Sequence, residues 1–481
     1  MSEVQVYRDL GRSFSEWFDY VLEVAEVYDY GRYPAKGMGV WLPYGFKIRE
    51  YVISIIRKFL DSTGHEEILL PLLIPENILS KESEHIKGFE DQVFWVTHGG
   101  LEPLDVKLAL RPTSETALTY LESFWIKSYR QLPKKFYQIV SVFRYETRAT
   151  RAMIRVREVS TFKEAHTLHE DFNDCERQVL EAVDIYSKIF DSLGIPYVIS
   201  KRPEWDKFAG AIYTIAFDTL LPDGRVLQIG TVHNLGQNFT KVFEVRIQKS
   251  DGSIDYGWQT SYGISERIIA SVIAIHGDRR GLVLPFHIAP IQIVIIPLIT
   301  AETRDTVLKY SKKVFELLSS SGYRVYEDLR DELRPGEKFY YWEFKGVPLR
   351  VEVGVREVEG NYVTVFRRDT LERSKVSLNE LVSYVERVSR EYNENLSRRA
   401  WQAFKSRIIR LADISKAKEY LNTVRGIVEM PWCGSQECGL KLAELVDGDT
   451  LGTPLNEDAS GYNCVVCGSK ANTFMRLAKK Y

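Results

Sequence analysis

The spacing of hydrophobic and polar residues changes near residue 285 of this 481-residue chain. Before that point, short segments such as 213–218 and 241–247 alternate between apolar and polar residues, and they are separated by stretches with helical periodicity. This pattern predicts a large antiparallel sheet with helices packed on it. Beyond Ile291, single strands and helices follow one another, which predicts a compact α/β unit. Pro285 and Pro290 mark the boundary.

The same periodicity divides the rest of the chain further. Helices are expected at 303–319, 337–344 and 378–393, and strands at 323–327, 349–355 and 362–367. After residue 395 a helix-rich tail leads into a cysteine cluster. We therefore expect an α+β protein with three domains, at 1–285, 286–395 and 396–481.

Composition narrows the class of protein. The chain has 44% hydrophobic and 12% aromatic residues, enough for sizeable cores, and its formal net charge of −2 argues against a generally basic nucleic-acid coat. The first thirty residues contain no cleavable apolar stretch, and the longest apolar run, 288–299, is too short to span a bilayer. A cytoplasmic protein without membrane association is expected.

Four of the five cysteines form two pairs, Cys433-x4-Cys438 and Cys464-x2-Cys467. Paired cysteines at this spacing favour tetrahedral Zn2+ over disulfides in a cytosolic chain, and neighbouring glycines let the backbone wrap around the ion. Ligation by cysteine alone is typical of a closed, structural site. The sequence therefore predicts a zinc-binding C-terminal domain, whereas Cys175 is expected to be an ordinary free thiol.

Charge is concentrated between Ser141 and His166, where two predicted strands, 140–146 and 153–159, flank a loop. The charged residues are Arg144, Arg148, Arg151, Arg155, Arg157, Glu146, Glu158 and Glu164. This density of charge is not expected in a hydrophobic core, because burying an unpaired guanidinium costs several kcal/mol of free energy, on the order of the desolvation penalty of one ion. Arginine forks fit phosphate oxygens bidentately, which favours a polyphosphate site under a mobile loop tip. A solvated hairpin with surface ion pairs is the alternative.

A second segment, 256–274, leads through small residues from a strand into an apolar helix whose first turn contains Arg267. Together with 140–159 it resembles motifs 2 and 3 of the class II aminoacyl-tRNA synthetases. The helix expected at 44–60 and the strand expected at 67–71 resemble motif 1 of that class. The three elements occur in the order that the class requires.

Within this class the chain resembles the prolyl-tRNA synthetases of the archaeal and eukaryotic-like type, from about Trp17 to its last residue. The segments that match are 111–115, 143–146, 162–167, 207–211, 228–239 and 342–350. The resemblance implies ATP-dependent attachment of L-proline to tRNA(Pro) through a prolyl adenylate, with release of AMP and diphosphate. Between Glu158 and His166 the chain departs from many relatives, which have a tryptophan-glutamine pair and one residue fewer, so the partner of Phe162 is left open.

The resemblance also implies which residues form the site. The expected catalytic residues are Arg144, Arg155 and Arg267. The expected amino-acid-binding residues are Thr113, Glu115, Arg144, Phe162, Phe208, His233, Ser261 and Gly263. The expected ATP-binding residues are Arg144, Glu146, Arg155, Gln228, Thr231 and Arg267. Mg2+ is expected as counter-ion of the phosphates, with Glu158 as one candidate ligand. Such in-line chemistry requires positioning and charge neutralisation more than a protein acid or base.

The α/β domain resembles the anticodon-binding module of class IIa synthetases. Glu343, Arg350 and Arg356 match the family positions that read the guanines of proline anticodons, although a salt bridge between Glu343 and Arg350 is the alternative. The segment 396–410 has basic residues and no acid, and is either a solvated helix face or a contact for tRNA phosphates. Motif 1 implies a homodimer, and the terminal Tyr481 resembles family C-termini that fold back toward the active site.

Three other functions stay open at this point. They are a class IIa synthetase for threonine, glycine or histidine, a non-catalytic RNA-binding paralogue, and an unrelated ATP-dependent ligase. The chain has no room between motifs 2 and 3 for an inserted editing domain. Shape alone discriminates a missing methylene by only about 10–200-fold, so activation of alanine or cysteine is expected, without editing of alanyl-tRNA in cis.

Overall fold

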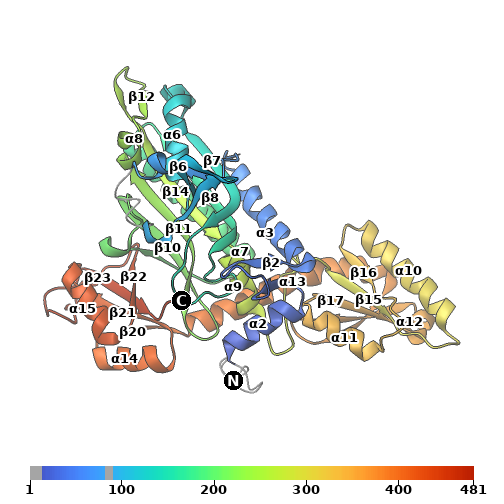
Figure 1. Cartoon of the computed structure of the whole chain (residues 1–481). Coiled ribbons are helices and arrows are strands. Elements are labelled where there is room, and N and C mark those ends of the chain that lie inside the picture. The colour runs from blue at the N-terminus through green and yellow to red at the C-terminus, as the bar shows by residue number, and fades with distance from the viewer. Residues whose placement is uncertain (1–12, 82–89) are drawn as a thin grey trace.

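The computed structural model describes residues 13–81 and 90–481, which form three lobes (Figure 1). The first twelve residues of the expected 1–285 domain lie outside the described residues. The first lobe holds a large sheet and its helices, the second lobe contains the yellow and orange elements, and the third contains the C-terminal elements in red. A long helix, α13 (Leu381–Lys405), runs from the second lobe to the third.

Seven neighbouring strands make the sheet of the first lobe. In spatial order they are β9 (Val198–Lys201), β10 (Tyr213–Leu220), β11 (Val226–Gly236), β14 (Trp258–Ser265), β8 (Glu158–His169), β7 (Lys134–Phe143) and β3 (Glu66–Glu67). All neighbours pair antiparallel except β3 and β7, which are parallel. The predicted strand at 213–218 and the strand before Arg267 are both part of this sheet, as expected.

Four helices contribute to the main core of this lobe. They are α2 (Phe14–Val24), α3 (Pro43–Asp61), α7 (Phe172–Ser192) and α9 (Arg267–His276). The buried residues of α2, α3 and α7 recur every three or four positions, whereas α9 is buried on nearly all sides, and α7 and α9 contact β11 and β14 directly. The helix expected at 44–60 is therefore confirmed as α3. Because helices cover this face, ligands must enter from the opposite face or from the strand ends.

Shorter elements complete the first lobe. They are β1 (Tyr28–Tyr30), β2 (Gly39–Trp41), β4 (Leu73–Pro75), α4 (Glu76–Leu79), η1 (Glu90–Gln92), β5 (Phe94–Gly99), β6 (Glu102–Leu110), α6 (Glu115–Trp125), η2 (Tyr129–Gln131), η3 (Glu204–Asp206), α8 (Asn238–Val242), β12 (Arg246–Gln248) and β13 (Ile254–Tyr256). Strands β4, β6 and β5 form a separate small sheet, and β1 pairs with β2 and β12 with β13. Helix α8 contacts α6, β11 and β14.

The second lobe is a five-stranded mixed sheet with helices. Its strand order is β16 (Val325–Glu327), β15 (Ile293–Pro297), β17 (Leu349–Val353), β18 (Tyr362–Arg367) and β19 (Arg373–Ser377). The helices are α10 (Arg304–Ser320), α11 (Pro335–Phe344), α12 (Val355–Gly360), η4 (Leu378–Glu380) and the first part of α13. Strands β15, β16 and β17 run parallel and the last two antiparallel. The alternation predicted beyond Ile291 is confirmed.

The third lobe extends the large sheet instead of forming a separate one. It consists of β20 (Ile408–Arg410), α14 (Ile414–Thr423), β21 (Ile427–Trp432), α15 (Gln436–Val446), β22 (Asp449–Pro454) and β23 (Thr473–Ala478). Strand β22 pairs with β9, so that eleven strands form one continuous sheet across two lobes. The expected boundary between residues 395 and 396 falls inside α13.

Two predicted strands are wrong over most of their length. The segment 241–247 contains the end of α8, because Phe239 and Phe243 lie four residues apart in one buried cluster, and Glu244 has a left-handed φ of 56° that no strand accommodates. Only Arg246 and Ile247 of this segment belong to a strand, β12. The segment 153–159 is a turn up to Glu158, where β8 begins, because Met153 also has a left-handed φ of 56°. Its apolar residues fill the core beneath the loop.

Three element ends also differ from the prediction. The strand expected at 67–71 is assigned only at Glu66–Glu67, although Ile68 still donates to the Tyr137 carbonyl. Strand β17 ends at Val353, because Gly354 caps α12 and donates to Glu357. The helix expected at 378–393 continues to Lys405. In the described part of the chain, no helix combines the length and the apolar character needed to cross a membrane.

Candidate active site

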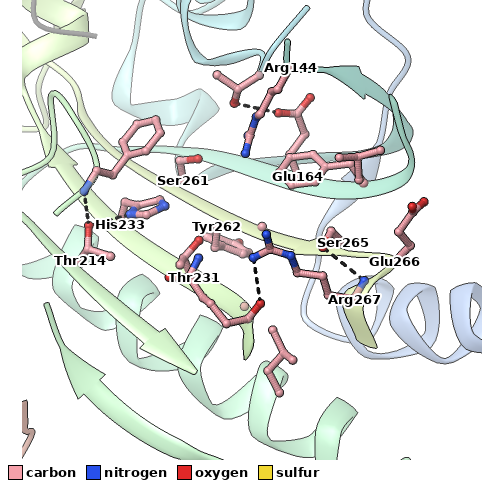
Figure 2. A pocket seen from close by; sticks show the side chains of 18 of the residues that line it. Arg144, Glu164, Thr214, Thr231, His233, Ser261, Tyr262, Ser265, Glu266 and Arg267 are labelled. Atoms are coloured by element: carbon pink, nitrogen blue, oxygen red, sulfur yellow. Dashed lines mark hydrogen bonds between the residues drawn. The ribbon is translucent and has the colours of Figure 1, made fainter. Parts of the chain in front are cut away.

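A cavity of about 310 Å3 lies against strands β8, β11 and β14 of the large sheet. Every residue that the sequence predicted for catalysis, amino-acid binding or ATP binding lines it. These residues are Thr113, Glu115, Arg144, Glu146, Arg155, Phe162, Phe208, Gln228, Thr231, His233, Ser261, Gly263 and Arg267. They come from segments up to about 150 residues apart, and the antiparallel pairing brings them together. Figure 2 shows Arg144 and Arg267 pointing toward the same space, and Ser261 of β14 lies at its side.

Three arginines make one end of the cavity strongly positive. Arg144 Nε, just beyond β7, donates to the Pro112 carbonyl at 3.2 Å, and Arg267 Nε at the start of α9 donates to the Ile154 carbonyl at 2.9 Å. Burial, and then the charges of Arg144 and Arg155, lower the pKa of Arg267 to about 10. Arg155 has Glu146 at 3.8 Å as a distant partner. This end therefore has an excess of positive charge at the N-terminus of a helix, which suits a polyphosphate.

Two buried carboxylates lie near Arg144, and their charges oppose the lowering of its pKa by burial. Glu115 is the first residue of α6 and accepts hydrogen bonds from Thr113 Oγ1 and, at 2.7 Å, from Ser261 Oγ. Glu164 on β8 accepts from the Ser114 N–H at 3.1 Å and from Gln138 Nε2 at 2.7 Å. These bonds fix the turn before α6. The carboxylate of Glu115 lies where it could accept from a cationic amine in the cavity.

Aromatic rings close the side of the cavity near β11. The rings of Phe208 and His233 are stacked with centroids 4.5 Å apart. Thr214 orients both, because its hydroxyl lies 2.8 Å from His233 Nδ1 and accepts from the Phe208 N–H at 2.9 Å. On β8, the Phe162 ring packs over Gly263, where a Cβ atom would lie only 3.0 Å from the ring. The glycine thus makes room for the aromatic wall.

Three residues at the cavity have roles that the sequence motifs did not predict. Glu164 anchors the turn before α6, Thr214 orients the aromatic pair, and Glu266 precedes Arg267. Glu266 accepts from Ser160 Oγ at 2.7 Å and from the Thr161 N–H at 3.1 Å, and burial raises its pKa to about 7. Strand alternation alone would have put Glu164 on the same face as Phe162.

The C-terminal residue lies next to the arginine end. Tyr481 and Lys480 line a smaller cavity of about 150 Å3 together with Gln228 and Arg267. The Tyr481 hydroxyl donates to Asp223 at 2.6 Å, and its ring lies 5.6 Å from the guanidinium of Arg151. Arg151 belongs to the loop between β7 and β8. The third lobe thus contacts the loop that borders the cavity.

The four paired cysteines form a single cluster in the third lobe. The Sγ atoms of Cys433, Cys438, Cys464 and Cys467 all lie within 4.8 Å of one another, and those of Cys433 and Cys467 are 3.9 Å apart. A tetrahedral Zn2+ with Zn–S bonds of about 2.3 Å would place its sulfurs about 3.8 Å apart. The donor set fits the predicted ion. Cys175 is buried elsewhere, on α7.

The residues expected to read the anticodon lie in the second lobe, away from the cavity (Figure 1). Arg350 on β17 is 3% exposed, pairs with Glu343 of α11 at 2.7 Å and with Glu352 at 2.8 Å, and lies between two aromatic rings. The salt bridge that the sequence left as an alternative is therefore formed. Arg356 is exposed in the first turn of α12.

Family models match each of the three lobes. Residues 94–276 match the tRNA synthetase class II core domain (G, H, P, S and T). Residues 292–388 match an anticodon binding domain, and residues 414–481 match the C-terminal model of prolyl-tRNA synthetase. The three matches follow the order of the lobes along the chain.

Similar proteins extend over the whole chain. A proline–tRNA ligase of Aeropyrum pernix is 60% identical over 472 residues, which cover 97% of both chains. One of Saccharolobus islandicus is 59% identical and covers 98% of both. Among solved structures, Giardia lamblia prolyl-tRNA synthetase in complex with prolyl-adenylate has a TM-score of 0.95 and 34% identity, with 100% of both chains covered.

Proposed function

The chain belongs to the proline–tRNA ligase family of class II aminoacyl-tRNA synthetases, and from this premise we propose that it attaches L-proline to tRNA(Pro) in two steps. Proline and ATP first give prolyl adenylate and diphosphate, and the terminal ribose of the tRNA then takes the prolyl group, with release of AMP. The observation that supports this best is the arrangement of charge in one cavity, where Arg144 has the buried carboxylates of Glu115 and Glu164 as neighbours and Arg267 has Arg144 and Arg155 as neighbours.

At the carboxylate end, Glu115 would bind the protonated ring nitrogen of proline. Its acceptor bonds from Thr113 and Ser261 hold the carboxylate in place before the substrate arrives, which reduces the entropic cost of binding. Phe162, Phe208 and His233 would enclose the apolar ring, and Gly263 leaves space beside Phe162. A primary amine with a smaller side chain fits the same site, so alanine should be activated weakly.

At the arginine end, Arg144 would bind the α-phosphate and orient the proline carboxylate for attack. Arg155 and Arg267 would hold the outer phosphates, which become the leaving diphosphate. Gln228, Thr231 and Glu146 would contact the ribose and adenine. Because charge develops on the phosphate oxygens in the transition state, preorganised guanidinium donors stabilise it without moving.

Two metal ions fit the residues present. Mg2+ would neutralise ATP phosphates, and Glu146, which lines the cavity near the arginines, is an oxygen donor that suits it. Glu158, the ligand expected from the sequence, is not among the residues that line the cavity and accepts a 3.3 Å hydrogen bond from Ser141 Oγ. Zn2+ would be held by Cys433, Cys438, Cys464 and Cys467 as a closed structural site. Metal analysis of the folded protein tests the zinc site, because less than one Zn2+ per chain would contradict it.

tRNA would be recognised mainly by the second lobe. Arg350 is buried and pairs with Glu343, so within the anticodon site it would orient the Glu343 carboxylate. Arg356 is exposed and can contact the RNA directly. In the segment 396–410, Arg398, Arg399, Lys405 and Arg410 are exposed and can meet tRNA phosphates. Guanine recognition by arginine and carboxylate agrees with the chemistry of these side chains.

Further proposals concern assembly and organisation. A homodimer is supported by exposed apolar side chains of the motif 1 region and its surroundings, including Leu69, Leu101 and Phe124. Sedimentation equilibrium tests it. We also propose that the chain acts in the cytoplasm, where tRNA is charged for translation. The division into 1–285, 286–395 and 396–481 is kept as a proposal, with α13 shared by the last two parts.

Amino-acid-dependent ATP–pyrophosphate exchange across all twenty amino acids tests the proposed function. Exchange with proline, and weaker exchange with alanine or cysteine, is the expected result. Exchange driven by threonine, glycine or histidine would indicate another class IIa enzyme. Folded protein that is silent with every amino acid would favour the RNA-binding paralogue.

A further inference from the structure

An arginine at the boundary between the first and third lobes reaches the proposed ATP site. Arg202 directly follows β9, and its side chain is only 2% exposed. Its Nη1 donates to the main-chain carbonyl of Leu451 on β22. Its Nη2 donates to Asp218 Oδ1 at 2.7 Å and to Gln228 Oε1 at 2.9 Å. One guanidinium therefore joins the third lobe to a residue that lines the main cavity.

The carboxylate of Asp218 holds this guanidinium in place. Asp218 is buried on β10 and is the direct register partner of Gln228 on β11. Its other oxygen, Oδ2, has no hydrogen-bond partner in the described part of the chain, so its pairing is with Arg202. Leaving either member of such a buried pair without the other is costly. Because Nη2 has only two hydrogens, its bonds to Asp218 and Gln228 use both of them.

The third lobe fixes Arg202 from the other side. Gly452 of β22 has a left-handed φ of 99°, and a Cβ atom there would lie 2.1 Å from the Lys201 carbonyl oxygen and 3.1 Å from Arg202 Cα. The missing side chain lets β22 approach β9 closely enough for the Leu451 carbonyl to meet the guanidinium. The Arg202 N–H donates to the Thr214 carbonyl at 2.8 Å. Both the main chain and the side chain of Arg202 are thus held in the protein without ligand.

The bond from Arg202 sets the orientation of the Gln228 amide. A primary amide offers one acceptor oxygen and two donor hydrogens on its nitrogen, whereas a guanidinium offers donors only. Arg202 can therefore pair only with the amide oxygen, which leaves the amide nitrogen to donate elsewhere. The main-chain carbonyl of Gln228 accepts from Arg267 Nη1 at 3.3 Å. Gln228 lines both the main cavity and the smaller cavity that contains Arg202, so its amide lies at the border between them.

We propose that Arg202 is a positioning residue for ATP: held by Asp218 and by the Leu451 carbonyl, it turns the Gln228 amide so that Nε2 donates to an acceptor atom of the nucleoside. That acceptor is a ribose oxygen or an adenine ring nitrogen. Arg202 is not among the residues that line the main cavity, so it acts through Gln228. The inference rests on the proposed function for the identity of the nucleotide, and it gives the main chain of β22 a part in ATP binding.

Calorimetric titration of ATP into the full-length protein tests this coupling without the reaction. Gln228→Ala removes the amide and should weaken ATP binding about tenfold. Arg202→Lys keeps a charge for Asp218 but loses the planar fork, and should weaken ATP binding about three- to tenfold. Because both changes act on one amide, the double variant should bind ATP as Gln228→Ala does, within about twofold. Losses that multiply in the double variant would overturn the proposal.

Arg476→Lys is the matched control. Arg476 of β23 is a buried arginine at the same lobe boundary, where it pairs with Glu429 at 2.9 Å and donates to the Ile199 carbonyl of β9 at 2.6 Å. It lines neither of the two cavities that contain Gln228. Arg476→Lys should lower the melting temperature and leave ATP affinity within about twofold of the wild type. Equal losses of ATP affinity in Arg476→Lys and Arg202→Lys would mean that Arg202 only holds the lobes together, which contradicts the proposal.

ATP analogues identify the acceptor atom. The 2′-deoxy and 3′-deoxy analogues lack a ribose oxygen, and the deaza analogues lack an adenine ring nitrogen. The wild type should bind one of them about tenfold more weakly than ATP, and Gln228→Ala and Arg202→Lys should lose most of that discrimination. Discrimination that persists in Arg202→Lys, or that is absent from the wild type, would contradict the proposal.

An exposed substitution keeps the test independent of the buried arginine. Gln228→Glu retains a partner for Arg202 but offers no donor to the nucleoside, and it changes an exposed side chain, so the fold should not be affected. It should bind ATP no more tightly than Gln228→Ala does. ATP affinity equal to that of the wild type would show that the amide nitrogen is not required, and the proposed role of Arg202 would fail.

The proposed function is judged separately. Proline-dependent ATP–pyrophosphate exchange by the wild-type protein supports the ligase whatever the result with Arg202. If exchange occurs and the losses of ATP affinity multiply, only the role of Arg202 fails. If the wild type gives no binding heat with ATP and no amino acid drives exchange, the proposed function fails and the positioning role fails with it.

Discussion

The two ends of helix α9 hold two arginines in opposite electrostatic surroundings. At the N-terminus, Arg267 donates to main-chain carbonyls and has Arg144 and Arg155 as charged neighbours. Just beyond the C-terminus, Asp278 accepts two bonds, of 2.8 and 2.6 Å, from the fully buried Arg368 of the second lobe. Among the described residues, Arg267 makes no ion pair within 4 Å, whereas Arg368 makes one with ideal bidentate geometry.

The charged neighbours of an arginine distinguish a structural contact from a ligand-binding site. A buried arginine with a matching carboxylate is satisfied within the fold, and Asp278 in turn raises the pKa of Arg368 against the effect of burial. Arg267 is half-buried beside other arginines at a helix N-terminus, where the charges of Glu146 and Glu266 only partly oppose theirs, so it gains a full counter-charge when an anion arrives. The charge pattern of Arg267 is therefore a cost in the empty protein and a stabilising interaction in the complex with ATP.

Replacing Arg267, which is proposed to bind ATP phosphates, should have the largest effect on ATP–pyrophosphate exchange. Arg267→Ala removes a guanidinium that stabilises the phosphates in the transition state, so exchange should fall by about 1,000-fold. The melting temperature should stay the same or rise, because repulsion from Arg144 and Arg155 is relieved. ATP–pyrophosphate exchange and thermal unfolding without ligands measure the two effects. A large loss of stability would place Arg267 among the structural arginines.

Arg368→Ala tests the other end. It leaves Asp278 without its bidentate partner, and breaking a buried pair in this way costs about 3–5 kcal/mol of unfolding free energy. Denaturant unfolding measures this loss. Exchange per folded molecule at low temperature should stay within a few-fold of the wild type, because the second lobe does not line the cavity. A 1,000-fold loss of exchange with unchanged stability would reverse the comparison.

Arg350 is proposed to have both a structural and a binding role. It is paired with carboxylates as Arg368 is, and it is also proposed to contribute to tRNA binding. Arg350→Ala should raise the KM for tRNA by about tenfold, the effect of losing roughly 1.4 kcal/mol, and leave exchange intact. Arg356→Ala is the exposed control, which should raise the KM for tRNA without lowering the melting temperature. Aminoacylation at varied tRNA concentration measures both. If Arg350→Ala lowers only stability, its pair with Glu343 is purely structural.

Much of the cavity could be predicted from the sequence, because its residues belong to motifs with fixed spacing. Local pattern also gave α3, the strand at 213–218 and the elements of the second lobe. Local pattern did not predict the structure where tertiary packing determines the backbone conformation. At Glu244 and Met153 the backbone is left-handed, which prevents the apolar segments around them from continuing as strands. Arg368 and Asp278 are 90 residues apart in sequence, so no local sequence pattern predicts that they pair. The role of Glu164 depends on the turn at Ser114, which belongs to another element, and is likewise absent from the local pattern.

Replacing Tyr481 should have the smallest effect of these substitutions. Its aromatic ring contacts arginine side chains, whereas Arg368 has a carboxylate as partner and Arg267 is proposed to bind a ligand. Its ring lies 5.6 Å from Arg151 and 5.4 Å from Arg225, and its hydroxyl donates to Asp223. A cation–π contact of this kind contributes about 0.5–1 kcal/mol, so Tyr481→Ala should raise the KM for ATP about two- to fivefold by loosening the loop that holds Arg151. Tyr481→Phe keeps the ring and loses only the hydroxyl bond, so it should recover most of the affinity. If the two variants behave alike, the bond to Asp223 orders the C-terminus and the arginine contact contributes nothing.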